Sequence, residues 1–545
     1  MVWVKGLILA GPPGRGKVSG VIYFRRFPRG MPAETQTAAL SIDGTGLSLD
    51  GFESVARNGR GVVLAPAARE AVLAARRVVD EAVADGRVVY GVTTGFGNFA
   101  DVRIPVEHLR ELQLNLVRSH SAGVGEALGE PETRALMLLR ANVLARGFSG
   151  VRLDTLELLV AMLNRRVHPL VPSQGSVGAS GDLAPLAHLA LALVGEGECL
   201  FEGRRLASGA ALHAAALAPV TLEPKEGLAL INGTQLTTAV TGLALAEARR
   251  LAQSADVIGA LTLDALEGTD VAFDERIHAA RPHPGQVASA RNLRRLLEGS
   301  ALRASHRECG RVQDAYSLRC MPQVHGAVRD ALDFVSRTVG LEMNAATDNP
   351  MVFAETGEIL SGGNFHGQPV AIAADVLAIA VAELGAISER RTERLVNPAL
   401  SGLPAFLARD GGLHSGLMMA HVTAAALASE NKVLAHPASV DSIPTSAGKE
   451  DHVSMGAAAS HKAARAVRNT ARVLAVELIA AAEALEFRRP LRSSPALEAV
   501  HDRLRRSVPA HERDRVLGPE IEGTAARLAG REYLDAAERV CGTLD

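Results

Sequence analysis

Four long stretches rich in alanine and leucine constrain the fold of this chain most strongly. Each runs for roughly 20 to 30 residues without the capping breaks that end most helices of globular proteins. They occupy residues 235–266, 368–394, 414–435 and 455–485. Because long amphipathic helices bury their apolar faces against one another, the pattern predicts a mainly α protein built on an extended helical bundle. Only 3% of the residues are aromatic, so we expect small and aliphatic side chains to fill the contacts between helices.

Length, charge and cysteine content narrow the class of protein. A chain of 545 residues suggests about three or four domains. The net charge of −2 gives no reason to expect binding to nucleic acid or to an anionic membrane. The four cysteines are far apart and lack metal-ligand spacing, which predicts reduced thiols in a cytoplasmic protein without a metal site. Asp182, Asp375 and Lys462 interrupt the most apolar runs, so none reaches the roughly 18 uncharged residues of a membrane span.

The first 36 residues differ from the rest, because basic side chains far outnumber the single acid, Glu34. Within them, residues 11–17 have the spacing of a phosphate-binding loop, but Val18 replaces the serine or threonine that would hold magnesium. We interpret residues 1–36 as a disordered extension or the product of an upstream start, with Met31 as the alternative first residue. A nucleotide-binding enzyme using residues 11–17 is the rival interpretation.

Shorter elements are expected between these landmarks. Residues 40–44 and 47–51 read as two short strands and predict a hairpin. A proline in the first turn and a glycine after the end predict a helix over residues 66–84. Further helices are expected at residues 105–118, 130–145 and 186–194, and a surface hairpin at residues 196–206.

A loop rich in glycine and serine, residues 175–186, has the most unusual chemistry in the sequence. It reads Gly-Ser-Val-Gly-Ala-Ser-Gly-Asp-Leu-Ala-Pro-Leu, and glycine permits bent backbone and close approach. The Gly181 nitrogen could attack the Ala179 carbonyl carbon, and loss of two waters, one using the Ser180 hydroxyl, would leave a five-membered electrophilic ring. The simpler alternative is a flexible loop in which Ser180 or Asp182 caps the next helix.

These twelve residues resemble the signature of the histidine/phenylalanine/tyrosine ammonia-lyase family, which builds the electrophile 4-methylideneimidazol-5-one from Ala-Ser-Gly. Further segments agree with the family in the same order. They are Tyr-Gly-Val-Thr-Thr-Gly-Phe-Gly from Tyr90, Ser119-His120, Asn-Gly-Thr from Asn232, Gln-Asp-Ala-Tyr-Ser-Leu-Arg-Cys from Gln313, Gly-Asn-Phe-His from Gly363 and Glu-Asp-His-Val-Ser-Met from Glu450. The resemblance covers the chain from about residue 40 onward. It implies long, near-parallel helices with a smaller, loop-rich N-terminal part.

The resemblance also implies an organisation and a set of site residues. The expected parts are an N-terminal part with the catalytic loops, a central bundle and a C-terminal helical segment, at residues 37–235, 236–485 and 486–545. The implied catalytic residues are Tyr90 as base, the electrophile residues Ala179, Ser180 and Gly181, and Asn232 and Tyr316. The implied substrate-binding residues are His120, Gln313, Arg319, Phe365 and Glu450, with Phe365 packed against the electrophile and His120 and Glu450 addressing an imidazole.

Local chemistry leaves alternatives open for several of these residues. A planar guanidinium suits a substrate carboxylate, but Arg319 could instead form a structural ion pair. Gln313 and Tyr316, at i and i+3, are expected on one helix face. Taken alone, Tyr90 could be a packed aromatic and Glu450 a helix N-terminal acid.

The activity implied by the resemblance is elimination of ammonia from L-histidine to give trans-urocanate, the first step of histidine degradation. No diffusible cofactor and no metal are implied, and the expected assembly is a homotetramer whose active sites draw on three chains. A tyrosine or phenylalanine ammonia-lyase or an aminomutase is the alternative, although a carboxylate such as Glu450 suits an imidazole N–H and not a phenyl ring. Departures from the histidine-type pattern are found at Ala315, Met321, His325, Gly367-Gln368, Leu400 and Lys449. They concern pocket shape more than chemistry. A helical scaffold without activity is the alternative outside the family.

Overall fold

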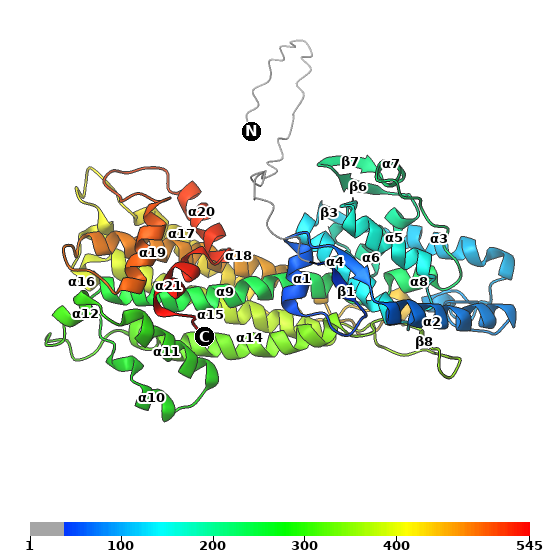
Figure 1. Ribbon diagram of the computed structural model, residues 1–545, viewed down its shortest axis with the longest axis horizontal. Helices are drawn as coiled ribbons and strands as arrows, with labels where there is room; N and C mark the ends of the chain where they lie inside the picture. The colour runs from blue at the N-terminus through cyan, green and yellow to red at the C-terminus, as the bar shows by residue number, and fades with distance from the viewer. Residues whose placement is uncertain (1–37) are drawn as a thin grey trace, which may run out of the picture. The chain divides into compact units, whose positions relative to one another are not determined.

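Four long helices run side by side through the centre of the bundle (Figure 1). They are α9 (Gln235–Ala265), α14 (Met321–Met343), α15 (Gln368–Val396) and α18 (Gly456–Glu486). The structure, a computed structural model, describes residues 38–545, and Ala39–Asp545 form one compact unit. Buried alanines such as Ala378 and Ala480 lie in this core, where small side chains let helix backbones approach closely. The predicted mainly α bundle is confirmed.

Shorter helices surround one end of the four long ones (Figure 1). They are α10 (Glu275–Ala279), α11 (Pro284–Leu297), α12 (Ala301–Ser305), α13 (Tyr316–Arg319), α16 (Pro398–Ser401), α17 (Met418–Leu434), α19 (Pro495–Arg505), α20 (Gly518–Ala529) and α21 (Glu532–Cys541). Among them, α11 packs on α14 and α9, and α17 packs on α15 and α18. Single 3₁₀ turns lie at Val271–Phe273 and Ala405–Leu407.

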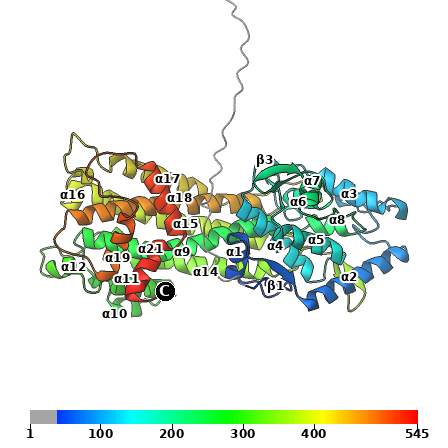
Figure 2. The same ribbon diagram turned by 45° about the horizontal axis from the view of Figure 1, so that its top comes forward.

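The N-terminal part surrounds the other end, where the labels α3, α6 and α8 lie in both views (Figures 1 and 2). Its helices are α1 (Leu49–Ala56), α2 (Pro66–Ala84), α3 (Leu109–His120), α4 (Glu130–Ala145), α5 (Leu153–Asn164), α6 (Leu183–Leu193), α7 (Ser208–Ala214) and α8 (Glu226–Ile231). Short 3₁₀ turns occur at Gly97–Phe99, Val106–His108 and Ser446–Gly448.

The strands within residues 38–545 are short and form four small sheets. The parallel pair is β1 (Leu40–Ile42) with β2 (Val62–Leu64), where Leu40 lies opposite Val62. The antiparallel pairs are β3 (Val124–Ala127) with β5 (Pro172–Gln174), and β8 (Met351–Phe353) with β9 (Glu358–Leu360). The antiparallel three-stranded sheet contains β4 (His168–Pro169), β6 (Glu198–Phe201) and β7 (Arg204–Ala207). These strands brace the loops, whereas the helices form the core.

Most of the predicted elements are present. The helices at Pro66–Ala84 and Glu130–Ala145 and the hairpin of β6 and β7 match the sequence prediction. The hairpin predicted over residues 40–51 is wrong. The second half of that segment is the helix α1, because the Ser48 hydroxyl caps it by accepting the Gly51 N–H at 3.1 Å and Phe52 and Val55 are buried at helical spacing. Residues 1–36, including the motif at 11–17, lie outside the described residues.

The helix α15 is, within the described part of the chain, the one helix long and apolar enough to cross a membrane. Of its most apolar 18-residue window, 67% is buried inside the fold. The helix packs against α14, α17 and α18, so its composition is that of a core helix in the bundle.

Candidate active site

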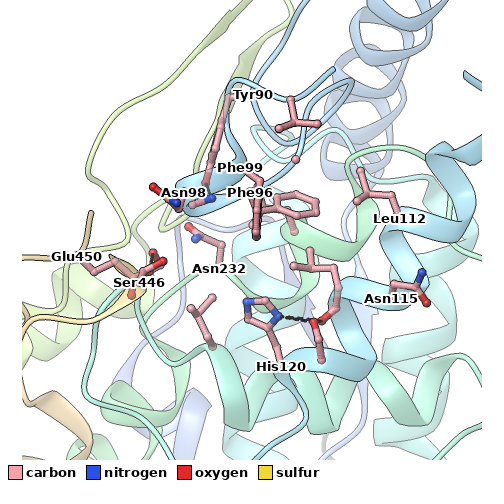
Figure 3. A pocket seen from close by; sticks show the side chains of 18 of the residues that line it. Tyr90, Phe96, Asn98, Phe99, Leu112, Asn115, His120, Asn232, Ser446 and Glu450 are labelled. Carbon is pink, nitrogen blue, oxygen red and sulfur yellow. Dashed lines mark hydrogen bonds between the residues drawn. The ribbon is translucent and has the colours of Figure 1, made fainter. Parts of the chain in front are cut away.

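A cavity of about 700 Å³ lies at the end of the fold that carries α3, α6 and α8 (Figure 3). Loops far apart in the sequence surround it. Five of the predicted site residues line it, namely Tyr90, His120, Ser180, Asn232 and Glu450. These five residues, which the family resemblance singled out, therefore lie at one cavity in the fold.

The glycine-rich loop enters the cavity just before α6. Gly181 has a φ of +73°, and a Cβ atom there would lie 2.2 Å from the Gly233 carbonyl oxygen. The following residue, Asp182, donates its backbone N–H to the same oxygen at 2.7 Å. Only glycine combines this left-handed conformation with so close a contact between two backbone segments. The turn at Gly233 therefore fixes one side of the tripeptide Ala179-Ser180-Gly181.

The Asp182 side chain ties the glycine-rich loop to the start of α9. Its carboxyl group is fully buried and accepts hydrogen bonds from the Thr237 N–H at 2.8 Å, the Thr237 hydroxyl at 3.0 Å and the Ser176 hydroxyl at 3.1 Å. Burial raises the pKa of Asp182 to about 6, against the lowering effect of these donors. The carboxyl group ties the loop to the first turn of α9.

Ser180 faces a second loop that returns from the far end of the sequence. The Ser180 hydroxyl donates to Glu450 Oε1 at 3.1 Å, and the Thr445 hydroxyl donates to Glu450 Oε2 at 2.7 Å. Thr445 and Glu450 also form a backbone bridge that closes this loop. Each oxygen of the Glu450 carboxyl group thus accepts a hydrogen bond, which holds the group at the cavity wall.

His120 ends α3 at the floor of the cavity. Its Nδ1 lies 2.9 Å from the Leu116 carbonyl oxygen, and a carbonyl only accepts, so Nδ1 carries the hydrogen. Burial lowers the pKa of His120, although the Leu116 carbonyl and the charge of Glu450 raise it. Nε2 is then left with a lone pair on the cavity side, as the orientation of the ring in Figure 3 shows.

Asn232 and Tyr90 also line the cavity. Asn232 follows the last residue of α8, and its buried Oδ1 has no hydrogen-bond partner within residues 38–545. The Tyr90 hydroxyl oxygen accepts the Gly97 N–H at 3.2 Å. Both side chains therefore offer polar atoms to a ligand in a space that contains Ser180.

Gln313, Tyr316 and Arg319 lie elsewhere. The Arg311 guanidinium donates to Leu266 O at 2.9 Å, and Asp314 accepts the Thr269 N–H at 2.6 Å, so this segment is fixed to the C-terminal end of α9. The cavity is at the other end of that 31-residue helix, about 45 Å away at 1.5 Å per residue. Figure 1 accordingly shows α12 at the opposite end from α3.

The predicted helix face shared by Gln313 and Tyr316 is wrong, because helix α13 begins only at Tyr316. Asp314 is held by its bond to Thr269, and Ala315 is extended. The Arg319 guanidinium lies 4.5 Å from the centre of the exposed Tyr316 ring. Within the described residues, Arg319 forms none of the ion pairs that its alternative interpretation required.

Phe365 does not line the cavity, although its loop lies close by. A Cβ atom on Gly367 would lie 3.3 Å from the Ser454 hydroxyl and 3.4 Å from Thr234, so the loop packs beneath the glycine-rich segment. Ala179 and Gly181 likewise form the loop without lining the cavity, which Ser180 reaches alone among the three.

The sequence prediction missed several lining residues, which are Phe96, Asn98, Phe99, Leu112, Asn115 and Ser446. Leu112, Asn115 and Ser119, which all line the cavity, lie on one face of α3 at spacings of three and four residues. Helical periodicity projected backward from Ser119 could have found Leu112 and Asn115. No group of three or more His, Cys, Asp or Glu side chains in residues 38–545 is placed to hold a metal ion.

The sequence pattern of the family described as aromatic amino acid lyase matches residues 47–506. The chain belongs to the aromatic amino acid lyase family. This lyase is 56% identical over 512 residues to the histidine ammonia-lyase of Koribacter versatilis (strain Ellin345), which covers 92% of this chain and 99% of the relative.

Two solved structures of other aromatic amino acid lyase relatives are similar in fold. Histidine ammonia-lyase from Trypanosoma cruzi matches with a TM-score of 0.85 and 44% identity, over 92% of this chain and 95% of that one. Tyrosine aminomutase from Streptomyces globisporus matches with a TM-score of 0.86 and 40% identity, over 92% and 99%. A histidine ammonia-lyase and a tyrosine aminomutase thus share this fold. The residues around the cavity, not the fold, must therefore distinguish the substrates.

Proposed function

We propose that this lyase eliminates ammonia from L-histidine and releases trans-urocanate. The observation that carries the proposal is the meeting of His120 and Glu450 with Ser180 at one cavity. A carboxylate and a ring nitrogen with a free lone pair suit an imidazole N–H, and neither suits a phenyl ring. The relative from Koribacter versatilis, which the chain matches over nearly its full length, carries the name histidine ammonia-lyase.

The electrophile would be 4-methylideneimidazol-5-one formed from Ala179, Ser180 and Gly181, without a diffusible cofactor or a metal. The Gly181 nitrogen would bond to the Ala179 carbonyl carbon, and the carbonyl oxygen would leave as water with the hydrogens of the Gly181 and Ser180 amides. A second water would take the Ser180 hydroxyl and its Cα hydrogen. The left-handed Gly181 and the free Asn232 Oδ1 fit such a group. Once formed, it supplies an electron sink for the amine of the substrate.

Tyr90 would act as the base. With Tyr90 as an activated phenolate, the β-hydrogen of the substrate would pass as a proton to the Tyr90 oxygen, the carbon–nitrogen bond would break with its electron pair on nitrogen, and ammonia would leave as the double bond forms. The Gly97 N–H donates to that oxygen, where it would stabilise negative charge before the proton arrives. Glu450 would accept the imidazole N–H, and His120 would face the same ring.

The carboxylate of the substrate would meet Arg319, Gln313 and Tyr316 from another copy of the chain. These residues are at the far end of α9 from the cavity, and Tyr316 is 71% exposed. We therefore propose a homotetramer with shared active sites, in which Phe365 also approaches the electrophile. Nucleic acid and membrane play no part in this proposal, and reduced cysteines fit a cytoplasmic location.

Incubation of the purified protein with L-histidine, L-tyrosine and L-phenylalanine tests the substrate directly. We expect the absorbance of urocanate to appear and that of coumarate and cinnamate to stay near background. Coumarate or β-tyrosine as the main product would instead favour the tyrosine lyase or aminomutase alternative, which the similarity to tyrosine aminomutase keeps as the second candidate.

A further inference from the structure

Arg140 is a fully buried arginine in the middle of α4, outside the cavity. Its guanidinium donates to the Asn232 carbonyl oxygen at 2.8 Å, to Gln235 Oε1 at 2.7 Å and to the Ala229 carbonyl oxygen. Every one of these acceptors belongs to residues 229–235. A single side chain thus contacts the turn between α8 and α9 at three acceptors.

This turn needs such a donor because carbonyl groups at the end of a helix lack partners within the helix. Ala229 and Asn232 supply carbonyls at the end of α8, and Gln235 is the first residue of α9. The planar fork of an arginine holds several oxygens in a fixed geometry, whereas the ammonium of a lysine is a single point on a flexible stem. Burial lowers the pKa of Arg140 to about 10, so the group is still a cation at neutral pH.

The contact continues from Arg140 to the glycine-rich loop through Gly233. A Cβ atom on Gly233 would lie 2.6 Å from the Arg140 guanidinium, so glycine and arginine are packed directly together. On its other side, Gly233 forms a parallel backbone bridge with Gly181, and its carbonyl oxygen accepts the Asp182 N–H at 2.7 Å. Gly233 is therefore fixed between the guanidinium and the tripeptide.

We propose that Arg140 is a positioning residue for the self-processing of Ala179-Ser180-Gly181 and for the placement of Asn232. The inference rests on the proposed function, because it presumes that the tripeptide cyclises. Ring closure requires the Gly181 nitrogen to be held against the Ala179 carbonyl carbon, and such intramolecular reactions depend strongly on pre-arranged geometry. Arg140 supplies that arrangement without touching the reacting atoms, through Gly233.

Arg134 provides a matched control on the same helix. It is also buried, and it donates to the Val55 and Leu163 carbonyl oxygens at 3.0 and 3.1 Å. Neither acceptor lies in residues 175–186 or 229–235. Arg134→Met therefore reproduces the general cost of removing a buried guanidinium from α4 without disturbing the turn.

The test measures by mass spectrometry the fraction of chains that have lost two waters at residues 179–181. We compare the full-length wild type with R140M, R140K and R134M, and follow folding by circular dichroism and thermal unfolding. We expect R140M to be mainly unprocessed, R140K to be processed in part, and R134M to be processed as fully as the wild type at a similar loss of thermal stability. Among processed chains, R140K should have a lower kcat, because Asn232 is displaced.

Gln235→Met supplies a second variant that keeps the test decisive if R140M does not fold. It removes one acceptor of Arg140 and leaves the two carbonyls, so we expect slower processing after induction. Full processing of R140K and Q235M at the wild-type rate, or equal losses in R134M and R140M, would overturn the proposal. A wild type that loses no water would refute the proposed function instead, so the two failures are distinguishable.

Discussion

The Ser180 hydroxyl donates a hydrogen bond to Glu450 Oε1 at 3.1 Å, across 270 positions of sequence. The proposed processing removes that hydroxyl as water, so Oε1 would lose its donor and face the cavity with an open acceptor position. Oε2 stays bound to the Thr445 hydroxyl at 2.7 Å, which keeps the carboxylate in place. Formation of the electrophile would therefore also prepare the group that receives the imidazole N–H.

Glu450→Gln tests this role. Replacing the carboxylate by a neutral amide removes a charge-assisted hydrogen bond, so we expect kcat/KM for L-histidine to fall about 10- to 100-fold. The loss of two waters at residues 179–181 should be unchanged in mass spectra, because the amide oxygen can still accept the Ser180 hydroxyl. Thr445→Val, which removes only the support at Oε2, should have a smaller effect. Unchanged kcat/KM in E450Q would exclude Glu450 from substrate recognition.

Asp182 gives a prediction for stability against pH. Burial raises its pKa from 3.8 to about 6, so the folded state binds the proton more tightly than the unfolded state. The contribution of the protonated carboxyl group to stability is then complete below pH 4 and lost as the pH rises to 6, by about 3 kcal/mol. In Asp182→Asn this loss cannot occur. The Tm of the wild type relative to D182N should fall between pH 4 and 6, and parallel Tm curves would contradict the assignment.

How far the sequence could predict the structure depends on whether the deciding contact is local. Pro66 and Gly86 mark the ends of α2, and the prediction of that helix is confirmed. The helix face predicted for Gln313 and Tyr316 was wrong. The shape of this segment depends on the hydrogen bond between Asp314 and Thr269, which are 45 residues apart. The role of Arg140 could not be predicted from the sequence, because its three acceptors lie 89 to 95 positions away. Motifs located five of the cavity residues, whereas only the fold revealed the others and the contacts that hold them.

Gly181→Ala separates backbone strain from close contact. An alanine at this left-handed φ costs about 1–2 kcal/mol, and its Cβ would also lie 2.2 Å from the Gly233 carbonyl oxygen. We expect G181A to be destabilised and largely unprocessed by mass spectrometry. Gly357 has a similar φ of +68° but no atom within 4 Å of an added Cβ, so G357A should show the strain alone and full processing. Equal processing in G181A and G357A would mean that the close contact between Gly181 and Gly233 is not required for processing.

Mixed assemblies test whether one active site uses two chains. Ser180→Ala and Arg319→Ala should each be inactive, because the first lacks the electrophile and the second lacks the partner of the substrate carboxylate. Ser180 lines the cavity and Arg319 is at the other end of α9. Co-expression of the two variants should therefore restore activity in about one site in four by random assortment, where intact residues from different chains meet.

The control for this experiment uses two residues that meet within one chain. Ser180 and Glu450 are hydrogen-bonded to each other, so every site in a mixture of S180A and E450A contains one damaged residue. Purification through two different tags would isolate the mixed assemblies, and urocanate formation would be measured in both mixtures. We expect activity in the mixture of S180A and R319A. In the mixture of S180A and E450A, we expect no more activity than each variant has alone. Activity absent from both would mean that Arg319 serves no cavity of a neighbouring chain, and the shared site would have to be abandoned.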